Sequence, residues 1–381
     1  MIKILTIVGA RPQIIKAAAL SRAIKNKFAD KIKEKILHTG QHYDSNMSEI
    51  FFSELGIPYP DYNLNAGSGL HGEQTAKMIS GIEKILMSEK FNAVVVFGDT
   101  NSTLAGAIAA SKLHVPIIHI EAGLRSFNMS MPEEINRIVC DQLSTLLFAP
   151  TQTAINNLTQ EGFFTSKAAF PNGKQRNVFL SGDIMYDNML YYSSFAEKKT
   201  DILSRLRLTK GEYALATIHR DNNTDNPERL SAIFDALLEV SKQFSIKIII
   251  PIHPRTEKLL PLNLSPDIFD KLQKDNSILL MPPASFFEII TLEKHAQIIL
   301  TDSGGIQKEA YFLKKPSIIL RPETEWVEIT EQKAGIIADA NKDAIIKAFE
   351  CLRTSNLSYP SVFGNGQAAE FMLEKIITSS T

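Results

Sequence analysis

The chain has 381 residues, of which 44% are hydrophobic and 22% are charged, and its formal net charge is −1 at pH 7. This length and balance are typical of a globular protein with two domains. A net charge near zero excludes the global basic field that holds nucleic acid or anionic membranes, so any anion site must be a local cluster.

The first expected strand, Met1–Val8, is too short to span a bilayer and is not followed by a small-residue cleavage site. No other run approaches the roughly 20 apolar residues of a transmembrane helix. Two cysteines, Cys140 and Cys351, lie far apart and outside any CxxC pattern, which fits a reducing compartment. We therefore expect a cytoplasmic protein in which each cysteine is a small buried side chain.

Short β-branched runs alternate with helical patterns along the chain. The first series of expected strands continues with Lys35–Thr39, Ala93–Phe97, Ile117–Ile120, Leu146–Ala149 and Val178–Ser181. The second series comprises Tyr213–Ile218, Ile246–Ile250, Ser277–Leu280, Ile298–Thr301 and Ser317–Leu320. Expected helices include Pro12–Lys25, Thr75–Met87, Ser102–Lys112, Arg229–Gln243, Ile306–Leu313 and a last helix, Gln367–Ile377. Two such series predict two doubly wound α/β domains with parallel sheets, joined near residues 172–200.

Polar residues follow the ends of several expected strands, and ligands of open α/β sheets bind at that edge. The first group lies in Gly9–Lys16, where Pro12 suits the first helical position. Arg11 and Lys16 then lie near a helix N-terminus, where the helix dipole disfavours cations, which indicates an anion held between them. The alternative is a pair of solvated surface charges. The segment is neither a dinucleotide fingerprint nor a P-loop.

Carboxylates form the second group. Asp99 follows a strand, and its alternative role is the N-cap of the next helix. Glu121 is a poorer cap and is bracketed by apolar residues, which favours a functional role. Of the adjacent Glu133 and Glu134, one is expected to face solvent, and periodicity leaves open which.

The third group belongs to the second series. Ser303, Gly304 and Gly305 form a turn that leaves backbone amides available to phosphate oxygens, and Glu309 could accept a hydrogen bond from a ribose hydroxyl. The alternative is a plain N-cap. His219 ends another strand beside charged residues, and His253-Pro254-Arg255 repeats the theme. The eight histidines show no paired-ligand spacing, so we expect no metal site.

Taken together, these motifs resemble the non-hydrolysing UDP-N-acetylglucosamine 2-epimerase family. The resemblance runs along nearly the whole chain through GARPQIIK, HTGQHYD, FGDTNSTLAG, HIEAGLRS, MPEEINR, ATIHR, HPRT and TDSGGIQKEA. It implies a glycosyltransferase-B architecture of two Rossmann-like doubly wound domains with the active site in the interdomain cleft. The implied first domain is residues 1–175 plus 362–381, on the sugar side, and the second is 176–361, which binds UDP. It also implies a homodimer without a cofactor.

The resemblance assigns roles residue by residue. Asp99, Glu121 and Glu133 match the catalytic carboxylates, and His219 matches the catalytic histidine. The matching substrate-binding residues are Arg11, Lys16, Arg137, Ser303, Gly304, Gly305 and Glu309. One departure is Asn222, where the family commonly has Glu, so the contact made by that carboxylate is in doubt.

The implied reaction inverts carbon 2 of a UDP-linked acetamido sugar, through elimination of UDP to a 2-acetamidoglycal and its re-addition, for surface polysaccharide precursors. The sugar is N-acetylglucosamine or a 2,3-diacetamido uronate, and residues 321–328 look closest to the uronate branch. The alternatives are a glycosyltransferase of the same fold and a nucleotide-sugar sensor without catalysis. A Rossmann dehydrogenase is disfavoured by the missing glycine fingerprint.

Overall fold

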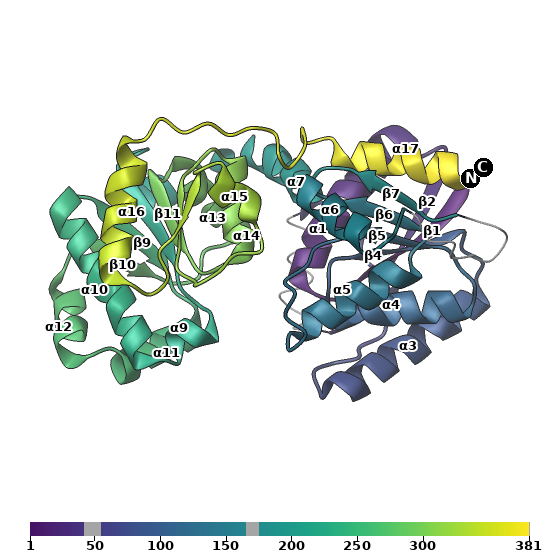
Figure 1. Ribbon diagram of the computed structural model, residues 1–381, viewed down its shortest axis with the longest axis horizontal. Helices are drawn as coiled ribbons and strands as arrows, with labels where there is room; N and C mark the ends of the chain where they lie inside the picture. Colours follow the sequence, from purple (N-terminus) through teal and green to yellow (C-terminus); the bar gives the residue numbers. More distant parts are fainter. Residues whose placement is uncertain (42–54, 165–174, 381) are drawn as a thin grey trace. The chain divides into compact units, whose positions relative to one another are not determined.

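The computed structural model describes residues 1–41, 55–164 and 175–380 (Figure 1). The chain divides into two compact units, Met1–Asn188 with Ser361–Thr381, and Met189–Pro360. Each unit contains one parallel sheet connected through helices, which confirms the predicted pair of doubly wound α/β domains. Of the HTGQHYD motif, residues 42–44 lie outside the described residues.

The sheet of the first unit has seven strands in the order β3-β2-β1-β4-β5-β6-β7. The strands are β1 (Ile2–Val8), β2 (Ile32–His38), β3 (Tyr62–Asn63), β4 (Ala93–Phe97), β5 (Ile117–Ile120), β6 (Leu146–Ala149) and β7 (Asn177–Leu180). Its helices are α1 (Arg11–Ala23), α3 (His71–Ser88), α4 (Asn101–Lys112), α5 (Pro132–Leu143), α6 (Gln152–Gln160) and α17 (Ala368–Ser380), and η1 (Ile24–Phe28) extends α1. The strand order reverses between β1 and β4, which is where ligands bind in this kind of sheet.

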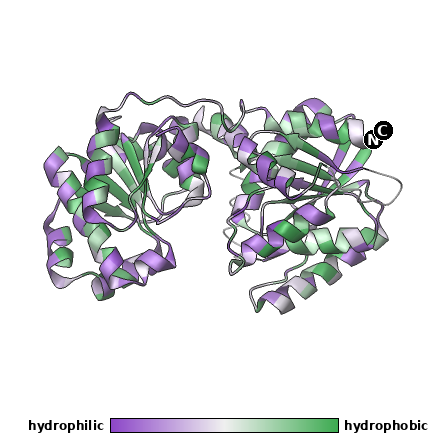
Figure 2. Ribbon diagram, in the orientation of Figure 1, coloured by the Kyte–Doolittle hydropathy of each residue, from purple (hydrophilic) through white to green (hydrophobic). Residues whose placement is uncertain are grey.

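The central strands are apolar on both sides because helices cover both faces of the sheet. All five residues of β4, Ala-Val-Val-Val-Phe, are buried. From α3, Met78 and Ile82 are buried in the same cluster as Val94 and Val96 of β4. Figure 2 shows the same division, with hydrophobic strands and helices that are polar on their outer sides.

The C-terminal helix α17 packs against α1 and so belongs to the first unit, although the second unit precedes it in the chain. Asp187 anchors it by accepting hydrogen bonds from the N–H groups of Ala368 at 3.0 Å and Ala369 at 2.8 Å. Burial raises the pKa of Asp187 to about 6, because these two donors compensate only part of its lost hydration.

The first unit extends to Asn188, within the segment 172–200 where the junction was expected. Two contacts hold this segment to the first unit. Strand β7 pairs with β6, so that Leu146 lies opposite Asn177. The Asn188 side chain then donates a 2.5 Å hydrogen bond to the carbonyl of Ile15 in α1. The start of α7 (Ile184–Ser193) is therefore part of the first unit.

The sheet of the second unit has six strands in the order β10-β9-β8-β11-β12-β13. The strands are β8 (Tyr213–Thr217), β9 (Lys247–Pro251), β10 (Ile278–Met281), β11 (Ile298–Thr301), β12 (Ser317–Ile319) and β13 (Gly335–Ile337). Its helices are α8 (Ile202–Arg205), α9 (Asp221–Thr224), α10 (Pro227–Phe244), α11 (Pro254–Asn263), α12 (Pro266–Lys274), α13 (Phe286–His295), α14 (Gly304–Phe312), α15 (Val327–Glu331) and α16 (Lys342–Thr354), and η3 (Ala196–Lys198) is a short 3-10 helix. The unpredicted β13 is a short edge strand with one buried residue, which leaves almost no sequence pattern.

The two cysteines differ in environment. Cys140 is fully buried, as predicted, but Cys351 is exposed, so that prediction was wrong. Helix α16 turns Ile345, Phe349 and Leu352 toward the core, and Cys351 lies outside that buried stripe.

Replacing Gly9 with alanine is expected to destabilise the first unit by about 1–3 kcal/mol, the usual effect of overpacking a core. A Cβ at Gly9 would lie 2.0 Å from Ser102 Oγ and 2.3 Å from Thr39 Oγ1, two hydroxyls that are hydrogen-bonded to each other at 2.8 Å. Urea denaturation measures the change. The matched control is Gly72→Ala in α3, where a Cβ meets nothing within 4 Å. Equal stability of the two variants would contradict this packing argument.

Candidate functional site

In the first unit, the predicted residues follow the carboxyl ends of β1, β4 and β5. Arg11, the first residue of α1, is exposed, whereas Lys16 is buried and forms an ion pair with Glu121. Gly98 lies against this pair, since a Cβ there would be 3.1 Å from Glu121 Oε2 and 3.2 Å from Lys16 Nζ. The structure thus joins Lys16 and Glu121, which are 105 residues apart in sequence, at one edge of the sheet.

Glu121 has an unusual backbone conformation for a residue with a side chain. Its φ is +71°, and its N–H donates to the carbonyl of Phe148 in β6 at 3.1 Å. A non-glycine residue in the left-handed region costs on the order of 1–3 kcal/mol and persists where the surroundings hold it. This strain, together with the buried ion pair, supports the functional interpretation of Glu121 over that of a helix cap.

Asp99 lies one residue beyond Gly98 and is held by an arginine. Arg137 of α5 donates to Asp99 Oδ2 through Nη2 at 2.7 Å and through Nε at 3.0 Å. The remaining terminal nitrogen of Arg137 donates to Glu134 at 2.7 Å. The N-cap of α4 is Thr100, so the cap alternative for Asp99 is wrong.

The structure distinguishes Glu133 from Glu134. Glu134 is 1% exposed and accepts hydrogen bonds from the N–H groups of Ser126 and Phe127, both at 2.9 Å. Burial opposes ionisation, but these donors and Arg137 outweigh it and hold the pKa of Glu134 below its usual value. Glu134 therefore anchors the loop before α5, whereas Glu133 is exposed and can meet a ligand.

Gln13 also contributes to this edge, although it was not among the predicted site residues and only its place in GARPQ pointed to it. Its side-chain oxygen accepts from the N–H groups of Gly9 at 2.9 Å and Ala10 at 3.2 Å. Its nitrogen donates to the carbonyl of Phe97 at the end of β4, at 2.9 Å. Gln13 thereby caps α1 and ties the turn after β1 to the end of β4.

In the second unit, His219 and the turn at Ser303 are brought together by Asp302. Asp302 is fully buried, and its Oδ1 lies 3.0 Å from His219 Nδ1. It also accepts from the backbone N–H groups of His219 and Arg220, each at 3.0 Å. Burial opposes its charge, but these contacts prevail and hold the pKa of Asp302 below its usual value. The His219 side chain remains 47% exposed, and its ring is oriented by the contact between Nδ1 and the buried Asp302 carboxylate.

The Ser303 turn precedes α14 as predicted. Ser303 is the N-cap and its Oγ accepts from the N–H of Ile306 at 3.5 Å, so the plain-cap alternative is present in the structure. Gly305 is exposed, and a Cβ there would meet only Ser303 Oγ at 3.7 Å. A Cβ at Gly304 would lie 3.3 Å from Glu325 Oε2, which is paired with Arg321. The geometry leaves the approach to Gly305 open, and this agrees with a phosphate-binding turn.

Glu309 of α14 is half-buried and has a second carboxyl group beside it, Glu293 of α13. Glu293 is fully buried, and among the described residues no N–H or O–H group donates to either of its oxygens. Burial first, and then the charge of Glu309, raise the pKa of Glu293 well above its usual value. These two causes favour the protonated form of Glu293.

Replacing Glu293 with glutamine is expected to increase stability at about pH 8 and to change it little near pH 4.5, the ordinary pKa of the group. The unfolded chain releases this proton near pH 4.5 but the folded chain retains it, so the wild type loses stability as pH rises toward its folded-state pKa. The slope for one proton is at most about 1.4 kcal/mol per pH unit. Urea denaturation across this range measures it. If the stability of the two proteins depended on pH in the same way, the raised pKa of Glu293 would be contradicted.

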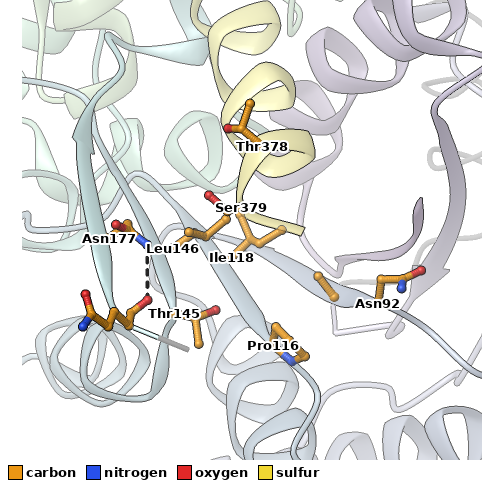
Figure 3. Close-up of a pocket in the computed structure, with 10 residues that line it drawn as sticks. Asn92, Pro116, Ile118, Thr145, Leu146, Asn177, Thr378 and Ser379 are labelled. Carbon is orange, nitrogen blue, oxygen red and sulfur yellow. Dashed lines mark hydrogen bonds between the residues drawn. The ribbon is translucent and has the colours of Figure 1, made fainter. Parts of the chain in front are cut away.

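A pocket of the first unit lies away from these residues (Figure 3). It is at the amino ends of the strands, lined by residues such as Ala93, Leu146 and Asn177, and the end of α17 contributes Thr378 and Ser379. None of the predicted site residues lines it. The pocket is thus at the edge of the sheet opposite to the candidate site.

Two other features are absent from the part of the chain that the structure describes. Over those residues, no group of three or more His, Cys, Asp or Glu side chains has an arrangement that would hold a metal ion. Within the same residues, no helix is both long enough and apolar enough to cross a membrane.

Comparison with known proteins identifies relatives along the whole chain. The family model for UDP-N-acetylglucosamine 2-epimerase matches residues 24–377. A UDP-2,3-diacetamido-2,3-dideoxy-D-glucuronate 2-epimerase from Pseudomonas aeruginosa is 44% identical over 98% of both chains. A UDP-N-acetylglucosamine 2-epimerase homolog from Methanococcus maripaludis is 47% identical, again over 98% of both chains.

A solved structure shows the same likeness in three dimensions. The crystal structure of the Methanocaldococcus jannaschii UDP-GlcNAc 2-epimerase, in complex with UDP-GlcNAc and UDP, has a TM-score of 0.83 and 43% identity. The match covers 99% of this chain and 100% of that one, so both α/β units are included. The likeness confirms the glycosyltransferase-B class of fold that the sequence predicted.

Proposed function

Because the chain belongs to the UDP-N-acetylglucosamine 2-epimerase family, we propose that it inverts carbon 2 of a UDP-linked acetamido sugar by eliminating and re-adding UDP. The observation that supports this most strongly is the cluster at the carboxyl edge of the first sheet. There, Gly98 lies against the Lys16–Glu121 ion pair, and the next residue, Asp99, pairs with Arg137. Acids held beside cations suit a reaction that moves a proton and develops positive charge on the sugar ring as a bond breaks.

The chemistry explains why several carboxylates are needed. Carbon 2 of an acetamido sugar is not adjacent to a carbonyl, so direct removal of its proton is prohibitive. When the bond between carbon 1 and the UDP oxygen breaks, positive charge develops on the ring and the carbon 2 proton becomes acidic. Carboxylates stabilise this charge, and one of them takes the proton to give a 2-acetamidoglycal. Protonation from the other face and re-addition of UDP give the epimer.

The residues divide between the sugar and the leaving group. Asp99, Glu121 and Glu133 are the proposed carboxylates at the sugar. Arg11, Lys16 and the amides of the Ser303 turn stabilise the departing diphosphate, with His219 as the proposed acid or base at the leaving group. Glu309 is the proposed ribose ligand. This proposal requires that water be excluded while the glycal is present.

Two substrates fit the family, UDP-N-acetylglucosamine and a UDP-2,3-diacetamido uronate, because relatives 44% identical to the chain carry both names. The test is to incubate the purified protein with each UDP-sugar alone and follow the products by NMR. We expect a new 2-epimeric UDP-sugar from one of them without any acceptor. A glycosyltransferase would instead require an acceptor, and a sensor would bind without turnover, so either result contradicts the proposal. Homodimerisation and a cytoplasmic location, for a role in surface polysaccharide precursors, stay predictions.

A further inference from the structure

A buried histidine lies two residues before Glu121 and contacts the backbone of Gly98, the residue before Asp99. His119, in β5, is 0% exposed, with Nδ1 2.7 Å from Asp141 Oδ1 and Nε2 2.8 Å from the carbonyl oxygen of Gly98. Both neighbours are acceptors. A neutral imidazole has one N–H, so only a ring protonated on both nitrogens can donate to both. The geometry therefore requires an imidazolium.

The surroundings balance this buried charge. Asp141 of α5 is also 0% exposed and lies 2.8 Å from Arg125 Nη1, and Arg125 in turn pairs with Glu161 at 2.6 Å. Two cations thus face two carboxylates. Burial opposes a charged ring, but neighbouring Cys140 and Asp141 prevail and raise the pKa of His119 well above its ordinary value.

The His119–Asp141 pair contacts backbone segments that have left-handed φ values. Gly98, Glu121 and Gly123 have φ values of +61°, +71° and +79°. His119 donates to the carbonyl of Gly98, and Asp141 accepts from the N–H of Gly123 at 3.1 Å. The two left-handed turns that carry Asp99 and Glu121 are therefore fixed by one charged pair.

We propose that the His119–Asp141 pair, with His119 as an imidazolium, is the positioning device that sets Asp99 and Glu121 for proton transfer at carbon 2. The inference rests on the proposed function. Gly98 lies against both Lys16 and Glu121. A shift of the Gly98 backbone would therefore also move the side chains of this ion pair. A misplacement of about 1 Å at a reacting group can lower a rate by about 10²-fold.

The first experiment reads the charge of the ring without any substrate. Nitrogen NMR of the histidine-labelled protein is expected to show both ring nitrogens of His119 still protonated at neutral pH, above the ordinary histidine pKa of about 6.5. The exposed His114 is the reference histidine in the same sample. A bare ring nitrogen on His119 at neutral pH would overturn the proposal.

The second experiment separates positioning from folding. His119→Gln is expected to lower kcat by about 10²-fold while the Kd for UDP, whose proposed site is on the second unit, changes less than about twofold. Asp141→Asn, which is similar in size, should lower kcat comparably, and the double variant should lose little more because the two act as a unit. The matched control is His114→Gln. A folded His119→Gln or Asp141→Asn protein with wild-type kcat would overturn the positioning role. If the wild-type protein showed no turnover, the proposed function would be refuted. The NMR result on the charge of His119 would still stand, because it needs no substrate.

Discussion

Replacing Glu121 with glutamine is expected to lower kcat by about 10²–10⁴-fold, the range supplied by a positioned acid or base. Glutamine keeps the size of the side chain and can still accept a hydrogen bond from Lys16, but it can neither take a proton nor stabilise a developing cation. The Kd for UDP should remain close to the wild-type value. Steady-state kinetics and UDP titration calorimetry measure the two quantities.

The control for Glu121 is Glu73→Gln, an exposed carboxylate in the first turn of α3. Its kinetics should equal those of the wild type. The Glu121 variant also leaves the buried Lys16 without a counter-charge, so its thermal unfolding must be recorded, and only a folded sample is informative. A folded Glu121→Gln protein with a wild-type rate would exclude this residue from the chemistry. The same logic applies to Asp99→Asn and Glu133→Gln, for which we also expect loss of turnover.

Asp302→Ala is expected to destabilise the second unit by about 3–5 kcal/mol, the usual loss when one partner of a buried charged network is removed. The change leaves the N–H groups of His219 and Arg220 without this acceptor and removes one of the two acceptors of the Asn223 side-chain amide. His219 also loses the carboxylate that orients its ring, so turnover should fall in the protein that remains folded. Urea denaturation at neutral pH measures the first effect.

The control is Asp267→Ala, because Asp267 forms an exposed ion pair with Lys271 one turn away in α12. Exposed pairs of this kind contribute about 0.3–0.5 kcal/mol. A loss of stability in Asp302→Ala as small as that of the control would contradict the role assigned to Asp302.

The fold was predictable because its signals are local. Runs such as Ala93–Phe97 are buried on both faces and so read as continuous apolar strands, and turn residues mark their ends. The edge strands were harder to predict, because β3 has two residues and β13 has three. The sequence placed the junction only within 172–200, because the contacts that bind this segment to the first unit, such as that of Asn188 with Ile15, join distant residues and leave no local pattern.

The candidate site was predictable only in part, since a sequence shows which residues follow strands but not which residues they contact. Lys16 and Glu121 were each selected, yet their pairing appears only in the structure. Arg137 was expected to bind substrate, and the structure shows that it also holds Asp99 and Glu134. The supporting residue His119 was missed because its partners come from other elements.

The account depends most directly on proton exchange at carbon 2 of the sugar. The decisive measurement is NMR of the protein with UDP-N-acetylglucosamine, and separately with its 2,3-diacetamido uronate analogue, in deuterated water. We predict that deuterium enters carbon 2 as the epimer forms, and that Glu121→Gln suppresses both processes together. An epimer that forms with its original hydrogen at carbon 2 would contradict the elimination mechanism and the roles given to these carboxylates.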